Sequence, residues 1–293
     1  MSNLEASYNL ILNNLREISG IEDFYFKPIK PKLSDIELIS LIILAEFKSI
    51  DSEHQLFREI KGFEIGPNIE RSVYNRRKRK LFPFIEEIRM KMVDKLNESE
   101  NYFIVDSMPL EVCKISRSFR SKICKDVDYA YPNKGFCASQ NLHFYGYKLH
   151  AVCSISSVFQ SFDISPASVH DIHYLQDIKL QMSDCVLLGD RGYLSTTQQL
   201  DLFETANIRL EKPMRINQKG YKKQTYIFRK SRKRIETLFS QLCDQFMIRR
   251  NYAKTFQGFK TRVLAKITAL TLVQFINKFI FDRPINNIKI QII

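Results

Sequence analysis

The sequence lacks the features that mark secreted, zinc-binding or membrane-spanning chains. Its six cysteines include no Cys-x-x-Cys pair, and the first residues show neither the basic nor the apolar run of a secretion signal. Its most apolar stretch, 264–281, is interrupted by lysine, glutamine and asparagine, which predicts a core helix and not a membrane span. These absences predict a cytoplasmic protein with reduced thiols and no membrane partner.

Acidic residues are also in short supply. The 293 residues contain 45 lysines and arginines against 32 aspartates and glutamates, which gives a net charge of +13. An excess of this size favours a polyanionic partner, with nucleic acid first and an anionic membrane surface second. Hydrophobic residues make up 44% of the chain and include 22 phenylalanines, so a packed core is expected and global disorder is excluded.

The first part of the chain, 1–97, is predicted to be helical throughout. The apolar periodicity indicates helices over 4–18, 35–47, 51–60, 68–81 and 83–96, the second of them capped by Ser34. The fourth helix carries six cations within ten residues, opposed only by Glu70. Short helices followed by a strongly basic one are typical of a helix-turn-helix-like DNA-binding region, and the alternative is a solvent-exposed basic face on an ordinary bundle. The residues that we expect to contact DNA here are Arg76, Arg77 and Arg79.

The remainder, 98–293, has the alternating pattern of an α/β domain. Strands are predicted over 102–106, 142–155, 158–165, 185–190 and 208–211, and helices over 171–182, 196–206, 226–250 and 258–281. The long segment 107–141 is predicted as a loop. Three consecutive strands followed by strands reached through helices favour a ribonuclease H-like mixed five-stranded sheet flanked by helices. In that arrangement the first and fourth strands are neighbours.

Three acidic residues occupy positions that suit metal chemistry. Asp106 and Asp190 each follow a short buried strand, and neighbouring strands would place them side by side. Glu236 borders the apolar stripe of the helix over 226–250, with Arg232 one turn before it and Arg229 two turns before it. The alternative for Glu236 is a surface ion pair with Arg232 that contributes a few tenths of a kcal/mol.

An all-carboxylate site without histidine or cysteine suits Mg²⁺, for which Mn²⁺ can substitute. Two such ions about 3.5–4 Å apart can activate a nucleophile and stabilise a leaving oxygen at phosphorus. Asp106, Asp190 and Glu236 are therefore the candidate metal ligands and catalytic residues. The cations that would hold the DNA backbone beside the metals are Arg229, Arg232 and Lys233.

Five motifs in order resemble those of insertion-sequence DDE transposases, most specifically the insertion sequence 982 family. They are Asp106-Ser107-Met108-Pro109, Gly146-Tyr147-Lys148-Leu149-His150, Pro166-Ala167-Ser168-Val169-His170-Asp171, Gly189-Asp190-Arg191-Gly192-Tyr193 and Arg232-Lys233-Arg234-Ile235-Glu236-Thr237-Leu238-Phe239-Ser240. The resemblance implies Asp106, Asp190 and Glu236 as the metal-binding triad. It also implies binding to terminal inverted repeats and target DNA, strand cleavage and transfer, and a homodimer in a synaptic complex, in a nucleoid-associated protein.

The helix over 226–250 departs from the signature Tyr-x2-Arg-x3-Glu-x6-Lys of related transposases. Arg232 and Glu236 match it, but Arg229 replaces the tyrosine and Cys243 replaces the lysine. In the helix predicted over 171–182, Asp171 is expected to be the N-terminal capping residue.

Two alternatives to a transposase stay open at this point. One is a metal-dependent nuclease of the same fold that cuts without joining, and the other is a catalytically inactive, transposase-derived DNA-binding protein.

Overall fold

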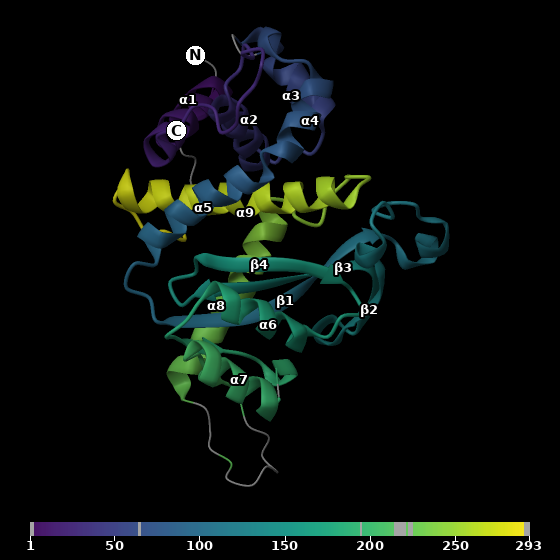
Figure 1. Cartoon of the computed structure of the whole chain (residues 1–293), viewed down its shortest axis with the longest axis vertical. Helices are drawn as coiled ribbons and strands as arrows, with labels where there is room; N and C mark the ends of the chain where they lie inside the picture. Colours follow the sequence, from purple (N-terminus) through teal and green to yellow (C-terminus); the bar gives the residue numbers. More distant parts are fainter. Residues whose placement is uncertain (1–2, 64–65, 194, 214–220, 222–224, 290–293) are drawn as a thin grey trace. The chain divides into compact units, whose positions relative to one another are not determined.

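The chain divides into two compact units, and Figure 1 labels their helices and strands. The computed structural model describes residues 3–63, 66–193, 195–213, 221 and 225–289. The helical unit comprises 1–96 and 242–293, and the sheet unit comprises 97–241. The first boundary lies one residue from the predicted one. The second was not predicted, because 242–293 was assigned to the catalytic domain and groups here with the N-terminal helices.

The helical unit packs its helices around two that are buried on nearly every side. These two are α2 (Asp35–Phe47) and α9 (Phe256–Phe279), whose apolar residues face all directions. Around them lie α1 (Asn3–Ser19), α3 (Glu53–Glu59), α4 (Arg71–Lys80) and α5 (Phe82–Leu96), with short 3-10 turns η1 (Ile60–Gly62) and η2 (Gly66–Asn68). The predicted helical N-terminal region is confirmed. No described helix is both long and apolar enough to cross a membrane.

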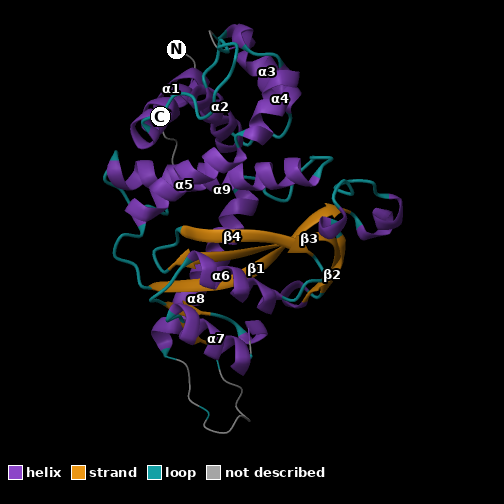
Figure 2. Cartoon of the chain, in the orientation of Figure 1, coloured by secondary structure: helices purple, strands orange, loops and turns teal. Residues whose placement is uncertain are grey.

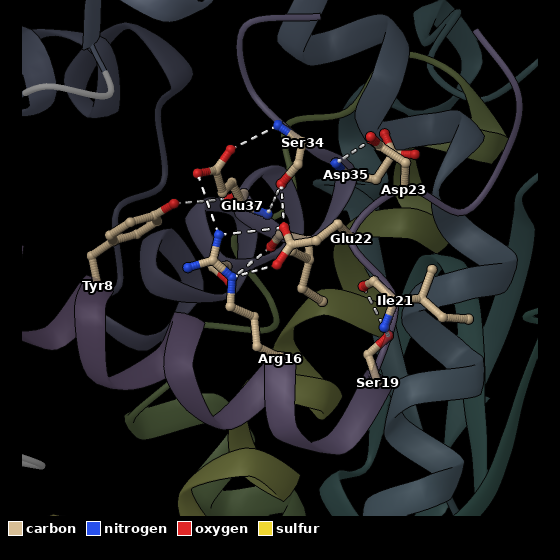
Figure 3. A network of polar contacts seen from close by, with 11 residues as sticks. Tyr8, Arg16, Ser19, Ile21, Glu22, Asp23, Ser34, Asp35 and Glu37 are labelled. Carbon is tan, nitrogen blue, oxygen red and sulfur yellow. Dashed lines mark hydrogen bonds and ion pairs between the residues drawn. The ribbon is translucent and has the colours of Figure 1, made fainter. Parts of the chain in front are cut away.

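The start of α2 is held by a polar network (Figure 3). Ser34 caps the helix as predicted, because its hydroxyl accepts a hydrogen bond from the Glu37 N–H while the Glu37 carboxylate accepts one from the Ser34 N–H at 2.7 Å. The Ser34 hydroxyl also donates to Glu22, which pairs with Arg16 of α1 at 2.5 Å. Two N–H groups at the start of α2 that have no partner within the helix are thus hydrogen-bonded. Through Glu22 and Arg16, the same network connects α1 to the start of α2.

The sheet unit is built around β1 (Tyr102–Cys113) (Figure 2). β1 pairs antiparallel with β3 (Leu142–Ser154) on one side and parallel with β5 (Val186–Leu188) on the other, and β6 (Arg209–Glu211) continues parallel to β5. The far edge of β3 pairs with β4 (Phe159–Pro166) and, further along, with β2 (Asn133–Cys137). The five predicted strands, their mixed directions and the neighbouring first and fourth strands are confirmed.

Two features of the sheet differ from the sequence prediction. β1 does not end at Asp106 but continues through Pro109 to Cys113, because its ladder with β3 extends well beyond its ladder with β5. The described pairing with β5 stops at Ile104, and proline is tolerated where a strand edge is open. The segment 107–141 is not all loop, since β2 forms within it. Lys134 and Phe136 of β2 are exposed and the other residues of the strand are only half-buried. The strand therefore has no run of apolar residues from which it could be predicted.

Helices cover both faces of the sheet. On one face, α6 (Tyr174–Gln181) and α7 (Thr196–Ala206) pack against Val105 of β1 and Val152 of β3 in a common core. On the other, α8 (Tyr226–Asp244) brings the ring of Phe239 to 6.2 Å from that of Phe159. Each fully buried apolar side chain contributes roughly 1.5–3 kcal/mol, so these two layers fix the sheet between them.

Candidate functional site

Asp106 and Asp190 meet because of the register of two parallel strands. The last pair between β1 and β5 joins Ile104 to Leu188, and each aspartate lies two residues beyond its member of that pair. Asp106 lies within β1 and Asp190 lies just past the end of β5, so the parallel register sets the two residues side by side. The structure therefore brings together two of the three predicted metal ligands.

Asp106 shows the cost of this arrangement. Its pKa is raised to about 7, first by burial and then by the charges of Asp190 and Asp171, while the Ser107 N–H and the charge of Arg232 act in the opposite direction. A desolvated carboxylate near other carboxylates needs a nearby cation to stabilise its ionised form. Arg232 of α8 supplies only part of that compensation.

Asp190 is held by the turn that follows it, η7 (Arg191–Tyr193). Its Oδ1 atom accepts a hydrogen bond from the Gly192 N–H at 2.6 Å, and a Cβ atom at position 192 would lie 2.9 Å from the same oxygen. A side chain at position 192 would therefore push the Asp190 carboxylate out of this position. Close to it in the chain, the buried Tyr193 hydroxyl makes no hydrogen bond to any described residue. Burial raises the pKa of Tyr193, and the charges of Asp171, Asp106 and Asp190 raise it further.

Asp171 does not cap a helix as predicted. His170 is the capping residue, since its Nδ1 atom accepts from the Ile172 N–H at 3.2 Å at the start of η6 (Asp171–His173). The Asp171 carboxylate instead accepts a hydrogen bond from the Lys148 ammonium of β3 at 2.9 Å. The Asp171 carboxylate thus binds the Lys148 ammonium and not the backbone N–H groups of its own helix, because a charge-assisted hydrogen bond is the stronger interaction. The sequence near Asp171 does not reveal this partner.

A buried histidine completes this side of the site. His150 lies on β3 two residues beyond Lys148, with its Nε2 atom 2.7 Å from the Ser165 hydroxyl and its Nδ1 atom 3.8 Å from Asp171. Burial lowers the pKa of His150 to about 4. Sequence analysis missed the pairing of Lys148, His150 and Asp171. All three residues lie in the motifs 146–150 and 166–171, but the sequence does not show that these two segments are in contact.

Glu236 is not brought to the aspartates. Its side chain is exposed on α8, and no three His, Cys, Asp or Glu side chains of the described residues converge closely enough to hold a metal ion. The α8 residue whose charge reaches Asp106 is Arg232, one turn before Glu236. The other two cations predicted on this helix, Arg229 and Lys233, are exposed.

The three arginines predicted to bind DNA on α4 have different environments. Arg76 is exposed and Arg79 is half-buried. Arg77 is buried, and its guanidinium donates to the Asp35 carboxylate at 2.7 Å and to the Leu33 carbonyl at 2.9 Å. Arg77 therefore holds α4 against the start of α2, which corrects its assignment as a phosphate contact.

The residues present are a partial fit for a divalent metal. Asp106 and Asp190 offer only oxygen donors, as hard cations require, and a bound cation would favour the ionised form of the buried Asp106. Hard cations keep several waters, so two protein ligands can anchor one ion. The third predicted ligand would have to approach from α8.

The mixed sheet and the paired aspartates together define a ribonuclease H-like α/β protein. A family model described as a transposase DDE domain matches residues 98–272, and the chain belongs to this family. Among solved structures, the chain is similar to one described as "Mos1 transposase paired-end complex with left transposon end", with 11% identity over 89% of this chain and 84% of that chain and a TM-score of 0.23. No curated protein sequence matches significantly.

Proposed function

We propose that the protein is a DNA transposase that binds the terminal inverted repeats of an insertion sequence and catalyses metal-dependent strand cleavage and strand transfer. The observation that carries the proposal is the register that sets Asp106 beside Asp190, in a chain of the transposase DDE family. The resemblance to the insertion sequence 982 family names the finer group within it.

Asp106 and Asp190 would hold Mg²⁺ or Mn²⁺, with two ions expected. The chemistry supplied by the bound ions is activation of a water or a 3′-hydroxyl and stabilisation of the leaving oxygen. Arg232 would balance the charge of Asp106 and, with the exposed Arg229 and Lys233, contact the DNA backbone.

Glu236 remains the proposed third ligand. It lies on the same line of α8 as Arg232, whose charge already acts on Asp106, and one helical turn spans about 5.4 Å. Binding of metal and DNA would supply the attraction that draws the exposed carboxylate inward.

Duplexes that carry the inverted-repeat ends, taken from the DNA that brackets the reading frame, provide the test. We expect wild-type protein to nick these ends with Mg²⁺ or Mn²⁺, and we expect Asp106→Asn and Asp190→Asn to bind the same DNA without nicking it. Nicking by either variant at the wild-type rate would overturn the assignment. Pre-cut ends, offered with a target plasmid, separate a transposase from a nuclease that cuts without joining, because only the transposase forms joined products.

A further inference from the structure

The helical unit contains a cavity that the proposed chemistry does not use. Its volume is about 670 Å³, and it lies between the end of α2, α3, α4 and the segment that leads into α9. That volume is in the range of pockets that bind small organic molecules. The charged residues that line it are the cations Arg71, Lys78, Arg79, Lys254 and Arg262 and the acids Glu46, Asp51 and Glu53.

Glu46, one of the acids that line the cavity, already forms ion pairs with cations of the chain. The buried Glu46 carboxylate accepts a hydrogen bond from Lys266 at 2.6 Å, and Arg262 and Lys78 lie 3.5 and 3.8 Å from its other oxygen. Burial alone would raise the pKa of Glu46, but the charges of Lys266, Lys78 and Arg262 lower it. One carboxylate thus serves three cations.

The two other acids are engaged as well. Asp51 accepts from Arg262 at 3.2 Å, and Glu53 accepts from the Asn75 amide at 2.7 Å. Every carboxylate that lines the cavity therefore has a partner, and cations remain in excess.

Several of these cations have donors without an acceptor in the described part of the chain. Lys78 makes no hydrogen bond to a described residue, and its ammonium lies 3.8 Å from a Glu46 carboxylate oxygen and 5.7 Å from the centre of the Tyr74 ring. Burial lowers the pKa of Lys78. The buried Arg262 Nε–H makes no hydrogen bond to a described residue, although it lies 3.5 Å from a Glu46 carboxylate oxygen, and the exposed Lys254 forms no ion pair with a described residue. The largely buried donors of Lys78 and Arg262 are costly unless an anion meets them, and the exposed Lys254 adds a further positive charge at the same cavity.

An aromatic ring stands beside these cations. Tyr252 lines the cavity with 65% of its surface exposed, only two residues before Lys254. Cations that meet phosphate, together with an exposed ring on which a base can stack, are the elements by which proteins bind single-stranded nucleic acid.

We propose that this cavity binds one phosphate-bearing nucleotide of an unpaired DNA strand, with the phosphate against Lys78, Lys254 and Arg262 and the base against Tyr252. A nucleotide that is still paired in a duplex could not bring its base to this ring. The proposal rests on the proposed function, and it adds a second, sequence-tolerant DNA contact in the helical unit.

The test uses the full-length protein and a fluorescein-labelled single-stranded oligonucleotide, with binding followed by anisotropy. Lys254→Gln should weaken binding about three- to tenfold and make the salt slope shallower by about 0.7, the value for one phosphate contact on a single strand. Tyr252→Ala should weaken it about tenfold. The matched control is Lys61→Gln, which removes the same charge from an exposed lysine of the helical unit that does not line the cavity, and it should bind like wild type.

Equal binding by Lys254→Gln, Tyr252→Ala and Lys61→Gln would overturn the proposal. So would displacement of the oligonucleotide by free dATP at matched nucleotide concentration, because the site would then serve free nucleotides and not a DNA strand. Neither result touches the proposed function, which is judged by the loss of nicking in Asp106→Asn. Failure of the wild-type protein to nick or bind inverted-repeat duplexes would refute the proposed function itself.

Discussion

The Asp106 carboxylate occupies a buried environment that is unfavourable to its charge. Its raised pKa shows that the ionised form is disfavoured by burial and by the charges of Asp190 and Asp171. A carboxyl group buried at such a cost is typical of a functional site, where the compensating charge arrives with the ligand. The same reasoning explains why two neighbouring carboxylates can anchor a cation although no complete metal site is formed.

Asp106→Asn should therefore raise the melting temperature of the metal-free protein at pH 8 by several degrees, because it removes the repelling charge and preserves the side-chain shape. Added Mg²⁺ should raise the melting temperature of the wild type and leave that of the variant unchanged. Calorimetry with and without EDTA measures both effects. A variant less stable than wild type in EDTA would mean that the Asp106 carboxylate already has its partner within the chain.

Asp171 is expected to act through its bond to Lys148. Removing a charge-assisted hydrogen bond of this type costs about 1.5–3 kcal/mol, and the Lys148 and Asp171 side chains are mostly buried, with 16% and 28% exposed. Asp171→Asn should lower stability by about that amount and slow nicking without abolishing it, unlike Asp190→Asn. A double-mutant cycle with Lys148→Met, measured by urea unfolding, isolates the interaction. Additive effects of the two substitutions would show that the pair is not coupled.

At the scale of elements, α4 has two roles on two faces. Arg77→Ala should lower stability by about 2–3 kcal/mol, because it leaves the buried Asp35 with Lys27 as its remaining ion-pair partner among the described residues. Arg76→Ala with Arg79→Ala should leave stability nearly unchanged and weaken binding to inverted-repeat duplexes, with a shallower salt slope. Urea unfolding and anisotropy titrations at two salt concentrations compare the two sets. Equal loss of DNA affinity in a folded Arg77→Ala protein would place Arg77 at the DNA after all.

The charge network of Glu46 connects three elements, since Glu46 belongs to α2, Lys78 to α4 and Lys266 to α9. The pKa of Glu46 is lower in the folded protein than in the unfolded chain. Its stabilising contribution is therefore present above the unfolded value and is lost as the pH falls through the folded value. Glu46→Gln should remove part of the acid sensitivity of unfolding below about pH 4.5 and destabilise the protein at pH 7. Chemical unfolding at pH 3.5, 5 and 7 tests this, and an unchanged pH profile would contradict it.

At the scale of the whole molecule, catalysis is expected to require a contact that the DNA-free chain does not show. Glu236→Gln should abolish nicking while inverted-repeat binding stays intact or becomes slightly tighter, because the carboxylate serves the metal and its charge opposes the phosphates. Gel-shift and nicking assays on one preparation measure both properties. Loss of binding together with activity would indicate that Glu236 has a structural role instead.

Local sequence patterns determined much of this protein. The apolar runs before Asp106 and Asp190 are short, so neighbouring residues alone identify the two strands. The order of strands and helices then leaves few topologies open. The five strands, the helical N-terminal region and the meeting of the two aspartates could therefore be predicted. The capping of α2 by Ser34 was equally local.

Only the tertiary structure decided the features that depend on a distant partner. Arg77 has a structural role because it forms an ion pair with Asp35 of another helix. Asp171 does not cap its own helix because its carboxylate forms an ion pair with Lys148 of β3. β2 formed because β3 offered an open edge, and residues 242–293 joined the N-terminal helices. A buried charge or a free strand edge is satisfied by the nearest complementary group in space, and the distance along the chain does not limit which group that is.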